Sequence, residues 1–385
     1  MNILFVAECC IEPSTGGVQR VTDTLAKGLI GNGHLVFFLS VRWGQMVPNY
    51  KTSAPQFHID VEHTSEWEDK VLSLVKEYSI EYVINQMPGA LTNRVLQVLK
   101  ERVKSVSVFH TQPYLEDDVK RRRVLRIRAN SLKQRAFKII SFISPSIRRV
   151  VLAQRESNII IKTLSVSDKI CFISEKFFPR IKRHIPNLPF ERIVAINNPN
   201  TFDSQEEISK NENLIIWVGR IENDIKNTLD FVKIWNLIYK DNPSWTAIVA
   251  GDGRDLDYVK HYAQKRRMNN ISFIGRSDDI QNLYRRAKIV VVTSFSESWC
   301  MALVEGLSHS CVVCAFDTFE TVHDIIHSNN GVVTRPSPKA MALQLSYLMN
   351  HPVELNNMSK NACGSIKRFR VEVIVKQWES LLKSL

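Results

Sequence analysis

Short apolar runs recur along the chain, separated by segments with a helical pattern, and this alternation constrains the fold more than any other feature. The runs are rich in β-branched residues and almost continuously apolar, as expected of strands that helices cover on both faces. Alternating strands and helices predict a parallel sheet. The runs of the first half are Ile3 to Ala7, Leu35 to Ser40, Tyr82 to Gln86, Ser105 to His110, Lys169 to Ser174 and Arg192 to Pro199.

The same pattern starts again after a polar segment that begins near residue 200. A chain of 385 residues exceeds the usual size of one domain, and each half is long enough to bury its own core. We therefore expect an α/β protein with two parallel-sheet domains. The later runs are Leu214 to Arg220, Thr246 to Gly253, Ile271 to Gly275, Ile289 to Ser294 and Cys311 to Phe316.

The composition, 44% hydrophobic and 23% charged, is that of an ordinary globular protein, and no run approaches the roughly 18 apolar residues of a membrane span. The start, MNILFVAECC, lacks the basic and long apolar regions of a secretory signal, so we expect a cytoplasmic protein. Seven cysteines, an odd number, predict reduced thiols. The CxxC at Cys311 to Cys314 lacks a second pair at zinc-ligand spacing, which favours buried thiols.

The net charge of +12 is concentrated in the segment 120–162, which holds thirteen Lys and Arg against one acid, Glu156. Two interpretations stay open: a helix packed on the sheet with a solvated basic back, which we favour, and a helix resting on an anionic membrane surface. The lack of interleaved aromatic residues argues against nucleic acid. The apolar face of the predicted helix consists of Leu125, Ala129, Leu132, Ala136, Ile139 and Ile143.

Residues that follow each run are candidate site residues, because ligands of open parallel sheets bind beyond the carboxyl ends of the strands. After the first run, Gly16 and Gly17 stand just before a predicted helix, whose N-terminal N–H groups suit an anion. An ordinary tight turn is the alternative. The dinucleotide fingerprint GxGxxG is absent from the chain.

A pair of cations follows the first run of the second domain. In VGRIENDIK, Arg220 comes directly after Gly219, and Lys226 lies six residues further on. A planar guanidinium and an ammonium at a strand end suit a diphosphate, although two ordinary surface charges would give the same pattern. Gly253, in AGDGRDL, marks another turn at a strand end.

The stretch ESWCMALVEG brackets an apolar run with two carboxylates, Glu297 and Glu305. Carboxylates are rarely buried without a polar partner, and this stretch follows a run typical of a core strand. A helix that begins near Met301 would direct the first N–H groups, up to Leu303, toward the same edge as the two cations. Because carboxylates accept from vicinal hydroxyls, these residues predict a site for a sugar, a diphosphate and a nucleoside.

Together these motifs resemble the retaining glycosyltransferases of family 4, the group 1 glycosyl transferases, over nearly the whole chain. The spacing of Glu297 and Glu305 matches that family's E-x7-E signature. The resemblance implies the GT-B fold, in which two Rossmann-like parallel-sheet domains face each other across a crevice. The features that carry it are, in order, GGVQRVTDTLAKGLIGNGHLV, VFHTQPY, CFISEKF, AINNP, WVGRIENDIKN, VAGDG, FIGRSDDIQNLYRRAKIVVVTSFSESWCMALVEGL and NGVVT.

The resemblance also implies how the chain is divided. An N-terminal acceptor-side domain is expected at 1–199 and a nucleotide-sugar donor domain at 200–367. The C-terminal helix, 368–385, is expected to pack back on the first domain.

The resemblance assigns roles to individual positions. Glu305 would hold the ribose hydroxyls, Glu297 would contact the transferred sugar, and His110 would lie near that sugar. The implied catalytic residues are His110, Arg220, Lys226 and Glu297. The implied donor-binding residues are Gly16, Gly17, Gly219, Arg220, Lys226, Gly253, Glu297, Met301, Ala302, Leu303 and Glu305.

The chain departs from the family pattern close to these positions. Ser298, Cys300 and Ser310 stand where glycines are usual, and the spacing from Arg220 to Lys226 is one residue longer than the commonest form. Glycines allow backbone amides to approach a ligand closely, so the substitutions affect how the donor is expected to lie.

The implied activity is transfer of a hexose, with retention, from a nucleotide diphosphate sugar, UDP being favoured, to a glycan or lipid-linked hydroxyl in cell-surface polysaccharide biosynthesis. No metal or other cofactor is expected, and attachment to the inner face of the membrane through 120–162 stays open. One rival is a nucleotide-sugar epimerase of the same fold. Others are a metal-dependent transferase using Asp255 and Asp257, and a non-catalytic basic protein that binds membrane surfaces.

Overall fold

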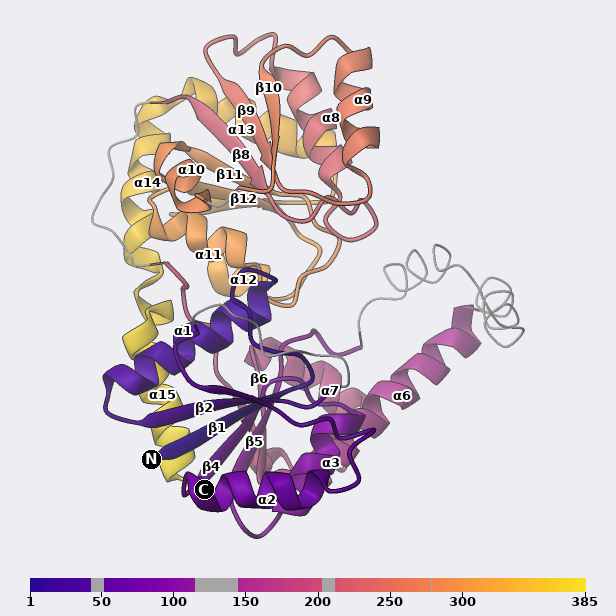
Figure 1. Cartoon of the computed structure of the whole chain (residues 1–385). Coiled ribbons are helices and arrows are strands. Elements are labelled where there is room, and N and C mark those ends of the chain that lie inside the picture. Colours follow the sequence, from indigo (N-terminus) through magenta and orange to yellow (C-terminus); the bar gives the residue numbers. More distant parts are fainter. Residues whose placement is uncertain (43–51, 115–144, 203–211, 278) are drawn as a thin grey trace. The chain divides into compact units, whose positions relative to one another are not determined.

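The computed structural model describes the chain except for residues 43–51, 115–144, 203–211 and 278. The predicted basic helix therefore lies outside the described residues. The chain forms two compact units (Figure 1). Among the described residues, unit 1 comprises Met1–Tyr114, the residues from 145 to Thr201, and Phe369–Leu385, and unit 2 comprises Phe202–Arg368.

Unit 1 is built on a seven-stranded parallel sheet of order β3-β2-β1-β4-β5-β6-β7. Its strands are β1 (Asn2–Ala7), β2 (Leu35–Ser40), β3 (Gln56–His58), β4 (Tyr82–Asn85), β5 (Lys104–Phe109), β6 (Lys169–Phe172) and β7 (Ile193–Ala195). Its helices are α1 (Gly17–Gly31), α2 (Trp67–Glu77), α3 (Ala90–Leu99), α6 (Pro145–Val166), α7 (Phe178–His184) and α15 (Val371–Lys383), with 3-10 turns η1 (Glu175–Phe177) and η2 (Phe190–Arg192).

Helices cover both faces of this sheet, and β1 shows how the sequence produces that arrangement. Side chains alternate along a strand, so neighbours in sequence pack on opposite faces. Ile3 and Phe5 belong to a buried cluster with residues of α1 and α15. Leu4 and Val6 belong to a second cluster with residues of α2 and α3. Burial on both sides explains why the run is continuously apolar.

The C-terminal helix α15 packs against α1. Val375 and Trp378 are buried in the same cluster as β1. Gly28 of α1 permits the close approach, because a Cβ at that position would lie 2.5 Å from Cγ2 of Val375. The helix is thus part of the core of unit 1.

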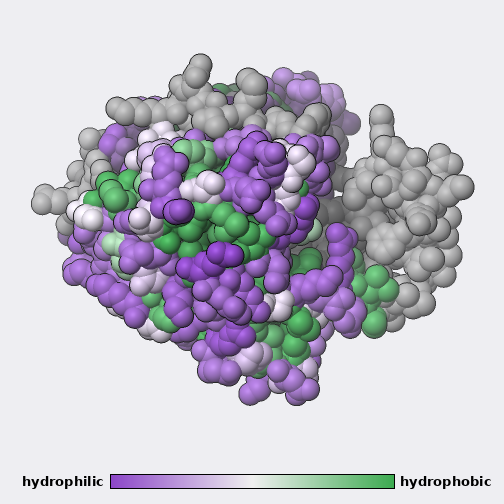
Figure 2. All heavy atoms as spheres, turned by 60° about the horizontal axis from the view of Figure 1, so that its bottom comes forward, coloured by the Kyte–Doolittle hydropathy of each residue, from purple (hydrophilic) through white to green (hydrophobic). Residues whose placement is uncertain are grey.

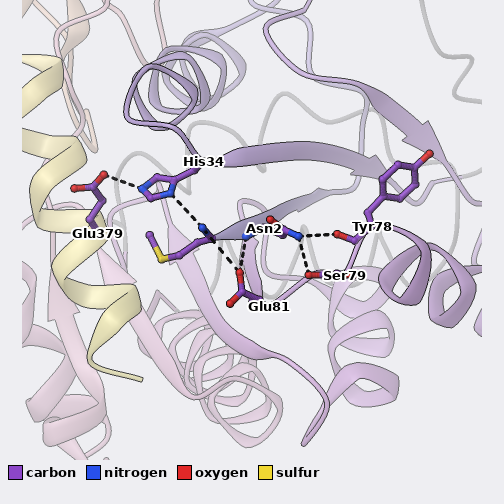
Figure 3. Close-up of polar contacts among 7 residues, drawn as sticks. Asn2, His34, Tyr78, Ser79, Glu81 and Glu379 are labelled. Carbon is purple, nitrogen blue, oxygen red and sulfur yellow. Dashed lines mark hydrogen bonds and ion pairs between the residues drawn. The ribbon is translucent and has the colours of Figure 1, made fainter.

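Polar contacts hold α15 to the loop between α1 and β2 (Figure 3). His34 Nε2 lies 2.8 Å from Glu379 Oε1. Asn32 donates to the same oxygen at 2.9 Å. These hydrogen bonds, the one from Asn32 first, lower the pKa of Glu379. The carboxylate therefore stays ionised to a lower pH than an unpaired glutamate would.

Unit 2 is built on a six-stranded parallel sheet of order β10-β9-β8-β11-β12-β13. Its strands are β8 (Leu214–Val218), β9 (Thr246–Ala250), β10 (Ile271–Gly275), β11 (Ile289–Val292), β12 (Val312–Phe316) and β13 (Gly331–Thr334). Its helices are α8 (Thr228–Ile238), α9 (Leu256–Lys265), α10 (Ile280–Arg286), α11 (Met301–Ser308), α12 (Val322–Ile325), α13 (Pro338–Asn350) and α14 (Pro352–Ser365); the turn η3 (Lys367–Phe369) follows.

The predicted fold class, two Rossmann-like parallel-sheet domains, is confirmed. Every predicted run contains a strand, but several strands end earlier than the run does: the run from Arg192 to Pro199 is a strand only over Ile193–Ala195. Beyond Ala195 this run continues as INNP, and its pairing with β6 stops there. β3 and β13 were not predicted.

Helix α6 follows the undescribed segment and carries exposed side chains from residue 149 onward. Val150 and Val151 are exposed large apolar residues, and Arg155 and Lys162 are exposed beside them. Figure 2 shows apolar residues in patches among hydrophilic ones on one face of the molecule. None of the helices in the described part of the chain is long and apolar enough to cross a membrane.

Candidate functional site

The candidate site of unit 2 lies at the carboxyl ends of β8 and β11. These strands are neighbours, and the strand order runs outward from them in both directions. Such a switch point is where ligands of open parallel sheets bind. The loop after β8 carries Arg220 and Lys226, and the loop after β11 carries Glu297.

Lys226 and Glu297 form an ion pair across this switch point. Lys226 Nζ lies 2.6 Å from Oε1 and 2.8 Å from Oε2 of Glu297. Ser294 Oγ also donates to Oε1, at 2.6 Å. The side chains of Lys226 and Glu297 are 29% and 9% exposed, so the pair is largely removed from water. The polar partner expected for Glu297 is therefore a lysine from the neighbouring loop.

The ion pair with Glu297 sets the protonation state of Lys226. Burial alone would lower the pKa of Lys226, but the carboxylate of Glu297 outweighs it and leaves that pKa raised. The charge of Arg220 acts in the opposite direction on Lys226. Lys226 is consequently an ammonium at neutral pH, and it can bind an anion.

Hydrogen bonds between the strand-end loops fix the position of this pair. The N–H of Phe295 donates to the carbonyl of Ile225 at 2.7 Å, and Thr293 Oγ1 donates to the carbonyl of Asn227 at 2.9 Å. From the loop after β12, Thr318 Oγ1 donates to the carbonyl of Ser294 at 2.5 Å. The loops after β8, β11 and β12, which are neighbours in the sheet, are thus joined by hydrogen bonds.

Two predicted donor-binding glycines serve close packing between the loops after β8 and β9. Gly219 donates its N–H to the carbonyl of Ala250 at 3.0 Å. A Cβ on Gly253 would lie 2.5 Å from the carbonyl oxygen of Ile221. A Cβ on Gly251, which was not predicted, would lie 1.8 Å from the carbonyl oxygen of Gly219. The backbones of these loops therefore touch, which only glycine allows.

Arg220 extends into solvent beside the pair. Its side chain is 70% exposed, and Nη1 lies 3.4 Å from Glu222 Oε1. An exposed pair of this length holds the guanidinium only weakly, so Arg220 can turn toward an anion at low cost.

Helix α11 begins at Met301, as predicted. Cys300 is its N-cap residue and makes no side-chain capping bond. The N–H of Leu303 donates to the carbonyl of Cys300 at 3.1 Å. This hydrogen bond engages one of the three predicted amides, so the N–H groups of Met301 and Ala302 are the better candidates for an anion.

Glu305 lies one turn into α11 and is 3% exposed. Its Oε2 accepts a hydrogen bond from the hydroxyl of Tyr284, in α10, at 3.0 Å. Glu305 is therefore buried and Glu297 partly buried, each beside polar partners.

In unit 1, Gly16 and Gly17 lie after β1, the strand next to the switch point between β1 and β4. Gly16 is the N-cap residue of α1, and a Cβ there would lie 3.0 Å from Gln19 Oε1. The N-terminus of α1 is thus at the carboxyl edge of this sheet, where the sequence predicted it.

His110 follows β5, and its Nε2 contacts Oε1 of Gln86, which follows β4. An amide oxygen can only accept, so the proton of the neutral ring lies on Nε2. Burial lowers the pKa of His110 to about 4, and a hydrogen bond with Asn198 acts weakly against this shift. His110 is therefore neutral at physiological pH, which suits a binding role better than an electrostatic one.

Sequence reasoning missed Ser294, Tyr284 and Gln86. Gln86 is the last residue of a predicted strand, and a polar residue at a strand's carboxyl end is a candidate for ligand binding. Tyr284 and Ser294 lie inside quoted motifs, but nothing in their spacing identified a partner. Among the described residues, no group of three or more His, Cys, Asp or Glu side chains could hold a metal ion.

Residues 199–364 match the family described as Glycosyl transferases group 1. An uncharacterized glycosyltransferase of Haemophilus influenzae is 22% identical over 385 residues, covering 96% of this chain and 97% of that protein. The amylovoran biosynthesis glycosyltransferase AmsD of Erwinia amylovora is 23% identical over 384 residues, covering 96% of each.

Among solved structures, Anabaena HepE in complex with UDP superposes with a TM-score of 0.72 at 17% identity, covering 100% of both chains. This likeness gives the fold, which is GT-B. Residues of unit 2 thus match the group 1 glycosyl transferases, and glycosyltransferases align along almost the entire sequence, so the chain is a glycosyltransferase of glycan biosynthesis.

Proposed function

We propose that the chain transfers a hexose from a UDP-sugar to a hydroxyl of a glycan or lipid-linked acceptor, with retention of configuration and without a metal. The observation that carries this proposal is the pair of Lys226 and Glu297 at the switch point of unit 2. It places a cation for a diphosphate next to a carboxylate for sugar hydroxyls.

The cation and the carboxylate satisfy each other when no donor is bound. When the donor binds, its phosphates offer Lys226 a second anionic partner, and the sugar hydroxyls offer Glu297 donors in place of the ammonium. Arg220 and the N–H groups of Met301 and Ala302 would stabilise the same diphosphate.

The reaction breaks the bond between the anomeric carbon and the β-phosphate oxygen and forms a bond from that carbon to the acceptor oxygen. The acceptor's proton passes to the departing phosphate, and UDP leaves. Negative charge grows on the phosphate as the first bond breaks, so Lys226 and Arg220 would stabilise the transition state more than the ground state. His110, neutral and held by Gln86, would bind the sugar and is not assigned as a base.

Two comparisons support the choice of donor and acceptor. HepE was solved with UDP, and AmsD is named for amylovoran biosynthesis. We extend the same nucleotide and a glycan acceptor to this chain. If the chain were a non-catalytic binding protein, the ion pair would have no donor to bind. If it were an epimerase, its product would be a sugar that is not joined to an acceptor.

The first test is a thermal-shift series with UDP, GDP and ADP, each with and without EDTA. A ligand that binds only the folded state raises the melting temperature with its occupancy. We expect UDP to stabilise the wild type regardless of EDTA, and Arg220→Ala and Glu305→Ala to lose the shift. No shift with any nucleotide would contradict the donor site, and NMR of the product's anomeric configuration would test retention.

We also propose that the basic segment brings the enzyme to an anionic membrane surface. The charge of 120–162 and the exposed apolar residues of α6 support this proposal. Flotation with phosphatidylglycerol liposomes should fall when Arg121, Arg122 and Arg123 are replaced by Gln. A matched change of Lys260, Lys265 and Arg266, in and just after α9, should leave flotation unchanged, and equal effects would contradict the proposal.

A further inference from the structure

We propose that Tyr284 is a positioning residue for the nucleotide: its hydroxyl sets the orientation in which Glu305 receives the ribose hydroxyls. This inference rests on the proposed function and extends it to a side chain from a different helix. It begins with the burial of both groups, since Tyr284 is 0% and Glu305 3% exposed.

A buried carboxylate needs a hydrogen-bond donor, and the hydroxyl of Tyr284 supplies one. It donates to Oε2 of Glu305 at 3.0 Å, from α10 to α11. A carboxylate has about four lone-pair sites, so this bond is compatible with accepting from two adjacent ribose hydroxyls as well. A tyrosine keeps the carboxylate charge available to the ligand, whereas a lysine or arginine would neutralise it.

The ring of Tyr284 is itself held in place. It stacks on His309, with ring centroids 5.8 Å apart and an angle of 23° between the planes. Phe202 packs against the ring at 6.2 Å. His309 Nδ1 in turn lies 2.8 Å from the backbone carbonyl oxygen of Glu305.

Tyr284 is therefore linked to Glu305 in two ways. Its ring stacks on His309, which contacts the backbone of Glu305, and its hydroxyl contacts the side chain of Glu305. Because the ring is held in place, the Tyr284 hydroxyl cannot follow the Glu305 carboxylate, and a rotation of the carboxylate would break their hydrogen bond. Glu305 is thus held in one orientation before the nucleotide arrives, which lowers the entropic cost of binding.

The test is Tyr284→Phe, which removes the hydroxyl and keeps the ring. Calorimetric titration of the full chain with UDP and with 2′-deoxy-UDP should show a loss of UDP affinity of roughly two- to tenfold, the usual cost of ordering one mobile side chain on binding. The preference of the wild type for UDP over 2′-deoxy-UDP should shrink in the variant. The donor KM should rise, while kcat at saturating donor stays near that of the wild type.

Tyr347→Phe is the matched control, because the hydroxyl of Tyr347 also donates to a glutamate, Glu354, at 2.7 Å, on the surface of unit 2. It should leave both titrations unchanged. In a Glu305→Gln background, Tyr284→Phe should cause little further loss, since the two residues act through one contact.

The outcomes distinguish failure of the positioning role of Tyr284 from failure of the donor site. An unchanged preference for UDP over 2′-deoxy-UDP in Tyr284→Phe, or an equal loss in Tyr347→Phe, would overturn the positioning role and leave the donor site intact. A wild type that binds neither nucleotide would overturn the proposed function and this inference with it.

Discussion

Replacing Glu297 by alanine should lower both stability and activity, because it leaves the Lys226 ammonium without its carboxylate. The two contacts of 2.6 and 2.8 Å would be lost, together with the bond from Ser294. The lysine is only 29% exposed, so water compensates for the loss incompletely.

The magnitude follows from the burial. Removing one partner of a buried pair typically costs about 3–5 kcal/mol, and the partial exposure of Lys226 places the cost near the lower end, at about 3 kcal/mol. For a domain of this size, that loss corresponds to a fall in melting temperature of roughly 6–12 °C.

Differential scanning calorimetry of the ligand-free chain measures the effect. Glu222→Ala is the control, because Glu222 pairs with the exposed Arg220 at 3.4 Å and such pairs contribute less than about 1 kcal/mol. A Glu297→Ala variant that melts within about 1 °C of the wild type would refute the reasoning, since a fall of that size lies well below the expected range.

A double variant separates stability from function. In Lys226→Met with Glu297→Leu, no charge is left unpaired, and apolar replacements of buried pairs are often neutral or stabilising. We expect most of the melting temperature to return while transfer activity stays lost. Recovery of activity would mean that neither side chain contacts the donor.

Gly251→Ala should strongly destabilise unit 2, because its Cβ would lie 1.8 Å from the carbonyl oxygen of Gly219. Gly275→Ala should cost only about 1–2 kcal/mol, because a Cβ there meets nothing within 4 Å and only the positive φ opposes it. Thermal melting of the two variants compares these losses of stability. Burial lowers the pKa of His110 to about 4, so between about pH 6.5 and pH 4 the unfolded chain binds a proton that the folded chain does not. The free energy of unfolding should therefore fall as the pH is lowered through this range. Urea unfolding of His110→Asn should show a weaker dependence of that free energy on pH. Transfer activity should survive EDTA and Asp257→Asn, and a loss in EDTA would favour the metal-dependent alternative.

The fold could be predicted from the sequence because buried parallel strands leave a strong local pattern. β2 and β10 have the predicted bounds, and both sheets are parallel. The two missed strands, β3 and β13, lie at sheet edges and span three and four residues, which is too short for a periodic signal.

The site could be predicted only as far as local spacing reaches. The E-x7-E spacing and the preceding strand located the start of α11, the burial of Glu305 and the partial burial of Glu297. The partners of these carboxylates come from other elements, and no spacing encodes which side chain meets which. The pairing of Lys226 with Glu297 was therefore not foreseen, although both residues had been assigned to the site.

The cysteine at the N-cap of α11 is compatible with a donor site, although the family pattern has a glycine there. A thiolate at this position would repel a phosphate, but burial and the carboxylate of Glu297 raise the pKa of Cys300, so the thiol stays neutral. Cys300 is also 3% exposed, so its side chain occupies the interior of unit 2 and leaves the partial positive charge of the helix N-terminus unopposed. Cys300→Gly should therefore lower the melting temperature and leave UDP affinity unchanged in a calorimetric titration; tighter binding by the variant would mean that the thiol crowds the donor.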